Sequence, residues 1–315
     1  MEKTEKKENL NNFFIYNFPV WLPIAINFFL FPVYTYFLLP EDYGIRAIVL
    51  LAILFLGIIT DFGINWVIRS KYFSFSNIIE RNSYLTTLLL ITFFPKGILY
   101  VFFYFFSIDI FPIIFENWNV IYNDLFRVQL LIFLFGFSNE VFFAIYIMER
   151  KSKNYSIISL LQYFTNILVS LFGLIYLKKG IISLLYGELA GVFIFQVFSF
   201  YIFRNILVLR FHKKAVKDVL KIGIPAMPKS LFQNIQMNID KYILQIFLPV
   251  SELGIFSKSQ FLYRGFSGFN KAFSNAYSPS YIKNMTKSGF DASTKSTMLY
   301  WLFLISCILV FAILL

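Results

Sequence analysis

The sequence predicts an all-α membrane protein, a polytopic bundle of about nine transmembrane helices. Of its 315 residues, 58% are hydrophobic, 21% aromatic and only 14% charged. A water-soluble domain carries about 25% charged residues. Most of the surface of this chain is therefore expected to face lipid, and the charges that remain gather in the short segments between apolar runs.

Nine segments are apolar over about 20 residues, the length that a membrane-spanning helix needs. They are Phe13–Leu38, Gly44–Ile68, Tyr84–Phe106, Leu125–Met148, Tyr155–Leu177, Ile181–Phe203, Ile222–Leu248, Gly254–Tyr281 and Thr297–Leu315. Residues 1–12 precede the first span and alternate Glu with Lys, which predicts a retained tail rather than a cleaved signal peptide.

The basic residues of the loops fix an orientation. One side of the membrane would carry 18 of them: Lys3, Lys6, Lys7, Arg69, Lys71, Arg81, Arg150, Lys151, Lys153, Arg204, Arg210, Lys213, Lys214, Lys217, Lys221, Lys283, Lys287 and Lys295. The other side would carry 4: Arg46, Lys178, Lys179 and Lys258. The richer side is expected to be cytoplasmic, with the N-terminus. Orientation thus explains the net charge of +11, and we expect no nucleic-acid partner.

Two segments about 205 to 210 residues apart resemble each other. Asn17-Phe18-Pro19 with Pro23 opens the first, which ends in Leu39-Pro40-Glu41-Asp42-Tyr43-Gly44-Ile45. Gly223-Ile224-Pro225 with Pro228 opens the second, which ends in Leu248-Pro249-Val250-Ser251-Glu252-Leu253-Gly254-Ile255. Six predicted helices separate the copies, so both enter the membrane in the same direction, as in parallel repeats.

The motifs LLPEDYGI, TDFGINWVIRSKYF and KIGIPAMPKSLFQNIQMNIDKYILQIFLPVSELGIFSKSQ resemble those of bacterial flippases that move lipid-linked O-antigen or capsule repeat units. These proteins belong to the multidrug/oligosaccharidyl-lipid/polysaccharide exporter superfamily. The resemblance implies the bacterial inner membrane and two six-helix lobes around a central cavity that opens alternately to either side. It implies a polyprenyl-diphosphate-linked oligosaccharide as substrate, and a polysaccharide polymerase and a chain-length regulator as further partners.

On that pattern, residues 13–203 form the first six-helix lobe, 204–221 a basic cytoplasmic linker along the lipid headgroups, and 222–315 helices seven to nine of an incomplete second lobe. Helices ten to twelve are missing from the sequence, which suggests a truncated chain.

Polar residues in the last predicted spans predict a water-filled cavity. Ser257, Gln260, Arg264, Gly268, Lys271, Asn275 and Ser278 recur at intervals of three and four in helix eight, as do Lys229, Gln233, Gln236 and Asp240 in helix seven. Such spacing places them on one face of each helix, and cations in a membrane face protein or water rather than lipid. Arg264 and Lys271 are the main candidates for contacts to the substrate diphosphate, with Gln260, Asn275, Lys229, Gln233, Gln236 and Lys96 beside them.

Four carboxylates, Asp61, Glu140, Glu188 and Asp240, are candidates for ion coupling, since burial favours the protonated form of a carboxyl group. Each could instead pair with a neighbouring helix, and Lys96 could lie at the membrane interface. His212, the only histidine, is expected in a solvated loop.

The sequence offers no nucleotide-binding G-x-x-x-x-G-K-[ST] loop and no His or Cys cluster with metal-ligand spacing, so we expect a transporter without cofactor, not an enzyme. The alternatives are a cation-coupled multidrug antiporter of the same superfamily, whose cavity should be less cationic, and a membrane polysaccharide polymerase, which tends to carry a larger external loop.

Overall fold

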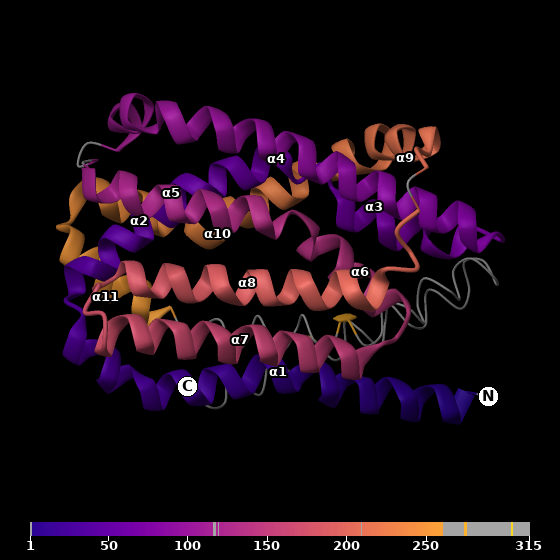
Figure 1. The fold of residues 1–315 in the computed structure, drawn as a ribbon, viewed down its shortest axis with the longest axis horizontal. Coiled ribbons are helices and arrows are strands. Elements are labelled where there is room, and N and C mark those ends of the chain that lie inside the picture. Colours follow the sequence, from indigo (N-terminus) through magenta and orange to yellow (C-terminus); the bar gives the residue numbers. More distant parts are fainter. Residues whose placement is uncertain are drawn as a thin grey trace.

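A computed structural model describes residues 2–260 except 116, 117, 119 and 209, together with 274, 275 and 304. Every regular element among these residues is a helix (Figure 1), which confirms the all-α prediction. The elements are α1 (Glu2–Phe37), α2 (Pro40–Thr60), α3 (Ile64–Lys71), η1 (Tyr72–Ser74), α4 (Ile78–Ile114), α5 (Val120–Phe135), η2 (Gly136–Ser138), α6 (Asn139–Met148), α7 (Ser152–Ile175), α8 (Ile182–Phe203), α9 (Lys213–Asp218), η3 (Val219–Gly223), α10 (Ile224–Phe247) and α11 (Val250–Ser259).

Several described helices are long and apolar enough to cross a membrane. They cover Asn11–Phe37, Ile78–Ile113, Val120–Met148, Ser152–Ile175 and Ile182–Phe203. Large apolar side chains such as Phe28, Phe29 and Tyr36 lie exposed along α1, as expected of a surface that faces lipid. The multi-pass prediction is thereby confirmed, whereas the count of nine spans stays a prediction.

Two predicted spans are interrupted. Gly44–Ile68 divides into α2 and α3, because Phe62 and Gly63 adopt positive φ angles of 43° and 58° that end the helix. Leu125–Met148 divides into α5 and α6 around the 3-10 turn η2. There the Gln196 amide of α8 donates to the Phe135 carbonyl, and the Ser138 hydroxyl donates to Gln196. A side chain from another helix thus satisfies backbone that the interruption leaves unpaired.

The predicted tail and the predicted linker both contain helix. α1 begins at Glu2, so the predicted tail continues the first helix. The predicted linker contains α9 and the π-helical turn η3, and its backbone is held by the start of α4. The hydroxyl of Ser83 donates to the Arg210 carbonyl, and the His212 amide donates to the Thr87 hydroxyl.

His212 differs from expectation as well, because its ring packs edge-on against Phe75 and Tyr84 and is half-buried. The Tyr84 hydroxyl also donates to Asp218. The linker is therefore fastened to α4 by side-chain contacts as well as by its backbone.

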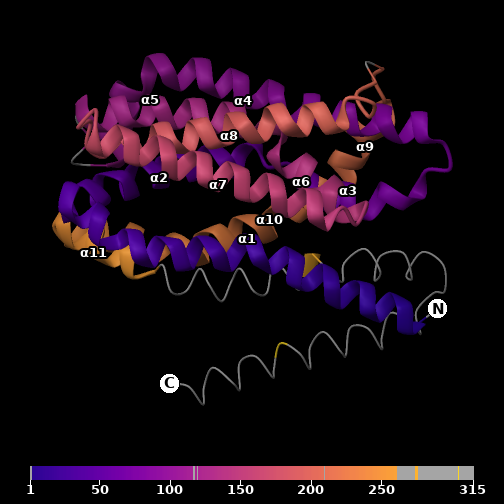
Figure 2. The same ribbon diagram turned by 60° about the horizontal axis from the view of Figure 1, so that its bottom comes forward.

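The helices form two layers (Figure 2). α4, α5, α7 and α8 lie in one layer, and α1, α10 and α11 lie below them in this view. α2 packs against α5 and also against α10 and α11, which connects the layers. α11 lies at one end of the bundle and α3 and α9 at the other (Figure 1); we name these the Gly44 end and the Gly63 end.

The two turns that the repeat aligns meet at the Gly44 end. A Cβ atom on Gly44 would lie 1.9 Å from the Val250 carbonyl oxygen, and one on Gly254 would lie 1.9 Å from that of Pro40. Only glycine allows so close an approach of two backbones. Gly44 of the first segment thus contacts the turn of the second, and Gly254 of the second contacts the turn of the first. These contacts bring α2 and α11 close together.

Candidate functional site

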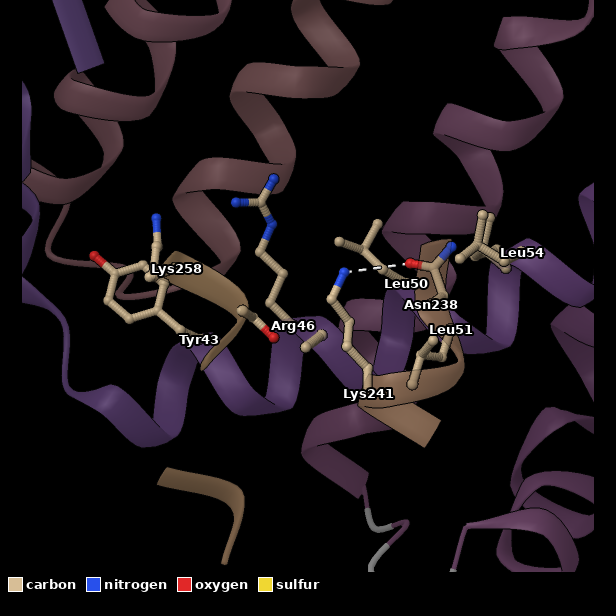
Figure 3. Close-up of a pocket in the computed structure, with 11 residues that line it drawn as sticks. Tyr43, Arg46, Leu50, Leu51, Leu54, Asn238, Lys241 and Lys258 are labelled. Carbon is tan, nitrogen blue, oxygen red and sulfur yellow. Dashed lines mark hydrogen bonds between the residues drawn. The ribbon is translucent and has the colours of Figure 1, made fainter. Parts of the chain in front are cut away.

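A cavity of about 310 Å³ lies between α2, α10 and α11, beside the glycine contacts of the Gly44 end (Figure 3). The residues that line it are Tyr43, Arg46, Ala47, Leu50, Leu51, Ile53, Leu54, Asn238, Lys241, Ser257 and Lys258. Its helices come from both copies of the repeat. The cavity therefore lies where the two copies face each other.

Three cations line this cavity. In the view of Figure 3, the Arg46 side chain lies between those of Lys258 and Lys241. The Lys241 ammonium donates to the Asn238 side chain at 3.2 Å, and Lys241 is only 8% exposed. The Lys258 ammonium lies 4.0 Å from the centre of the Tyr43 ring, a cation–π contact. Arg46 forms an ion pair with Glu188 of α8.

Two hydroxyl groups of the lining are buried without a hydrogen-bond partner among the described residues: those of Tyr43, which is 6% exposed, and Ser257. A buried hydroxyl without a partner is costly. Together with the cations, these donors give the cavity the chemistry of an anion site.

A second cavity of about 250 Å³ continues from the first along α2 and α10. It shares Leu51, Leu54 and Asn238 with the first. The other residues of its lining are Asn234, Ile235, Ile239 and Tyr242. A cationic space therefore adjoins one that is mainly apolar, with the Asn238 amide at their boundary and that of Asn234 in the second cavity.

The face of α10 that lines the cavities carries Asn234, Asn238 and Lys241, at intervals of four and three. The predicted stripe of Lys229, Gln233, Gln236 and Asp240 follows the same periodicity on another face. Residue spacing is consistent with either face of α10 lining a cavity. Only the packing of α10 against α2 shows which face lines the two cavities. Arg46, counted from the sequence as a loop charge, also lines the cavity.

The candidates of the predicted stripe have other neighbours. Gln233 and Gln236 are exposed, and the Lys229 ammonium lies 4.4 Å from the centre of the Trp66 ring. Asp240 accepts a hydrogen bond of 2.6 Å from Gln260, which ties α10 to the end of α11.

A second polar group lies nearer the Gly63 end. Asp61 hydrogen-bonds with Ser230 of α10 and interacts electrostatically with Lys96 of α4. Lys96 also interacts with Glu140 of α6, and its ammonium lies 4.9 Å from the centre of the Phe133 ring. The structure thus brings together three residues that the sequence could only name separately.

Arg69 of α3 lies in the same half of the molecule. Its guanidinium donates to Asn65 at 2.7 Å and to the candidate Asn275 at 3.3 Å. Asn275 is buried. Arg264 and Lys271, the main candidates from the sequence, lie outside the described residues. Among the residues that are described, no group of three or more His, Cys, Asp or Glu side chains could hold a metal ion.

Solved structures share this fold. A chain named protein A superposes with a TM-score of 0.74 at 16% identity, over 95% of this chain and 69% of its own. A MATE in complex with Br-NRF gives 0.61 at 16%, over 96% and 73%. A MOP superfamily transporter from Pyrococcus furiosus, described as having a binding pocket of reverse polarity, gives 0.53 at 16%, over 94% and 72%.

No curated protein matches the chain. A family model described as polysaccharide biosynthesis protein matches residues 33–314, nearly the whole sequence. The match confirms the family that the sequence motifs resemble. The chain belongs to the polysaccharide biosynthesis protein family and has the fold of the MOP superfamily transporters.

Proposed function

We propose that the protein is a flippase that moves a polyprenyl-diphosphate-linked oligosaccharide from the cytoplasmic to the outer leaflet of a bacterial inner membrane, for O-antigen, capsule or exopolysaccharide synthesis. The observation that supports it most is the cavity lined by Arg46, Lys241 and Lys258 between the repeat copies. In this orientation the N-terminus is cytoplasmic and the Gly44 end faces outward.

The cavity suits the three parts of such a substrate. Arg46 and the two lysines are donors for the diphosphate, and charge-assisted hydrogen bonds to phosphate are the strong ones. Asn234 and Asn238 can bind sugar hydroxyls. The leucine and isoleucine side chains of the adjoining cavity suit the first isoprene units of the lipid.

Cations near both ends of α10 would form successive stations. Lys229 and Lys241 are 12 residues apart on α10, which is about 18 Å of helical rise. Lys229 and Arg69 would receive the diphosphate at the cytoplasmic side, and Arg46, Lys241 and Lys258 would hold it before release. Arg264 and Lys271 remain part of this proposed path, along with Gln260, Gln233 and Gln236.

Ion coupling is assigned to the group around Lys96. Asp61 and Glu140 are two carboxylates with one cation between them. Protonation or binding of a monovalent cation would balance their charge, which the low dielectric of the membrane favours. Glu188 and Asp240 have partners in Arg46 and Gln260 and are assigned to substrate handling and helix contact.

The alternative, a multidrug antiporter, draws support from the MATE structures that share the fold. Cationic drugs would be repelled by Arg46, Lys241 and Lys258, whose charge the Glu188 carboxylate offsets only in part, whereas a diphosphate would be attracted. The sign of the charge on the substrate therefore separates the two functions.

The experiment is transport in proteoliposomes, with a fluorescent lipid-linked oligosaccharide and, separately, a cationic dye. Arg46→Gln, Lys241→Gln and Lys258→Gln should each reduce flipping about tenfold, the effect of one lost charge-assisted hydrogen bond. Lys179→Gln, at an exposed position, is the matched control and should flip normally. Flipping unchanged in all three variants, or efficient export of the dye by the wild type, would contradict the proposal.

A further inference from the structure

The ion pair between Arg46 and Glu188 joins the cavity to α8. Arg46 lines the cavity, and Glu188 contacts its guanidinium from outside the lining residues. Both side chains are partly exposed, at 21% and 24%. A carboxylate therefore occupies a donor site that the cavity would otherwise offer to a ligand.

Carboxylate and phosphate oxygens compete for the same donors. The guanidinium of arginine presents its N–H groups in a planar fork that fits either anion in two parallel hydrogen bonds. A phosphate that enters beside Arg46 must displace Glu188 or share the fork with it. Sharing would place two anions next to each other at one guanidinium, which is unfavourable even though both side chains of the pair are partly exposed.

We propose that Glu188 is an internal competitor that holds Arg46 in the empty cavity, yields it to the incoming diphosphate and recaptures it as the substrate leaves. The identity of the substrate rests on the proposed function. The role of Glu188 follows from the ion pair. Glu188 is thus a positioning residue whose effect passes through Arg46 and keeps the substrate from being held too tightly for release.

The position of Glu188 favours this role over a purely structural one. α8 is already fixed to α7 by close backbone contacts: a Cβ on Gly187 would lie 2.4 Å from the Asn166 carbonyl oxygen, and one on Gly191 would lie 2.7 Å from that of Gln162. Glu188 lies between these two glycines in sequence, on a helix that packs against both α7 and α5. The partner Arg46 lines the cavity rather than the α7–α8 contact.

The test measures binding of farnesyl diphosphate, a short prenyl diphosphate, to the full chain in nanodiscs. Glu188→Gln should bind it about three- to fivefold more tightly, the range expected for loss of a partly exposed competing ion pair. In the flipping assay the same variant should show a lower KM and a lower kcat, because the substrate leaves more slowly. The control Asp124→Asn removes a carboxylate from the exposed pair with Arg127. It should leave the affinity for farnesyl diphosphate, KM and kcat unchanged.

A double variant separates competition from simple repulsion. If Glu188 acts through Arg46, then Glu188→Gln should have no effect on affinity in an Arg46→Gln background. A gain of the same size in that background would overturn the inference. Should Glu188→Gln not fold, Glu188→Asp provides the same test, since a carboxylate one methylene shorter holds Arg46 less well and should also tighten binding.

Failure of this inference and failure of the proposed function give different results. If the wild type binds farnesyl diphosphate and Arg46→Gln weakens binding, but Glu188→Gln and Glu188→Asp leave it unchanged, the competitor role is wrong and the flippase stands. If Arg46→Gln alone binds normally, this inference fails while the flippase stands. If the wild type shows no binding, or Arg46→Gln, Lys241→Gln and Lys258→Gln all bind normally, the proposed function fails and this inference fails with it.

Discussion

Charged residues within the bundle occur with partners. Arg46 contacts Glu188, Asp240 accepts from Gln260, and Lys96 interacts with Asp61 and Glu140. A charge on a membrane helix costs about 2.5 to 3.5 kcal/mol on insertion scales, unless a partner or water compensates. Replacing one of these residues therefore also removes the compensation of its partner. The effect of a single substitution on stability then reflects the whole group of interacting residues.

The group around Lys96 allows a direct test of such dependence. Lys96→Met should lower the melting temperature by several degrees, because Asp61 loses the cation that compensates its charge. Adding Asp61→Asn should restore much of the loss, since an amide can still hydrogen-bond with Ser230. The measurement is thermal unfolding in detergent, with Lys179→Met as a control at an exposed site. Losses that simply add in the double variant would show that Lys96 and Asp61 act independently.

At the Gly63 end, outside the spans, a group of polar side chains also interacts around one carboxylate, that of Glu149. The Tyr72 hydroxyl donates to Glu149 at 2.7 Å, and Glu149 also contacts Arg81 and Lys151. Burial, together with the nearby Glu149 carboxylate, raises the pKa of Tyr72, so the hydroxyl stays protonated and keeps donating across the physiological range. This contact fixes η1 against the end of α6.

Among the elements, glycine controls how closely helices pack. Gly254→Ala should destabilise the protein, because the added methyl group would lie 1.9 Å from the Pro40 carbonyl oxygen and push α11 away from α2. Gly44→Ala should do the same by the reciprocal contact. At Gly57 a methyl group meets nothing within 4 Å, so Gly57→Ala should be neutral or slightly stabilising. Equal melting temperatures for the Gly57 and Gly254 variants would rule out this packing.

Apolar length was enough to predict the helices but not their interruptions. The break before α6 depends on the Gln196 amide, which comes from a helix far away in sequence. The break after α2 follows from positive φ at Phe62 and Gly63; glycine adopts this conformation readily, but no residue preference indicates it at Phe62. Local sequence therefore fixes that a segment is helical, and tertiary contacts decide where it ends.

The candidate site was predictable in kind but not in detail. Polar residues at helical spacing in the seventh and eighth predicted spans indicated a cavity with cations, and the role of Arg264 and Lys271 in it stays a prediction. The cavity that the structure describes is lined by Arg46, Lys241 and Lys258. Its α10 residues are Asn234, Asn238 and Lys241 rather than the predicted stripe, because periodicity defines several faces and only contact with α2 selects one. Arg46 follows a turn motif and so had the sequence context of a loop charge.

At the scale of the whole molecule, transport toward the outer leaflet requires that the Gly44 end face outward. α7 has 24 residues, about 36 Å of helix, with Lys151 just before it and Lys178 just after it. In a Cys307→Ser background, Lys151→Cys should react with an impermeant maleimide only after the membrane is opened, and Lys178→Cys in intact cells. Labelling of both positions from one side would refute the predicted topology.

The central claim is that the diphosphate of the substrate passes between α2 and the α10–α11 pair. The most direct measurement is photocrosslinking of a lipid-linked oligosaccharide that carries a photoreactive group on its first isoprene unit, with mass spectrometry of the attached peptides. We expect attachment within residues 43–54 and 234–258, reduced in Arg46→Gln. Attachment confined to exposed positions of α1 such as Phe28 and Phe29, with none in those two segments, would contradict the claim.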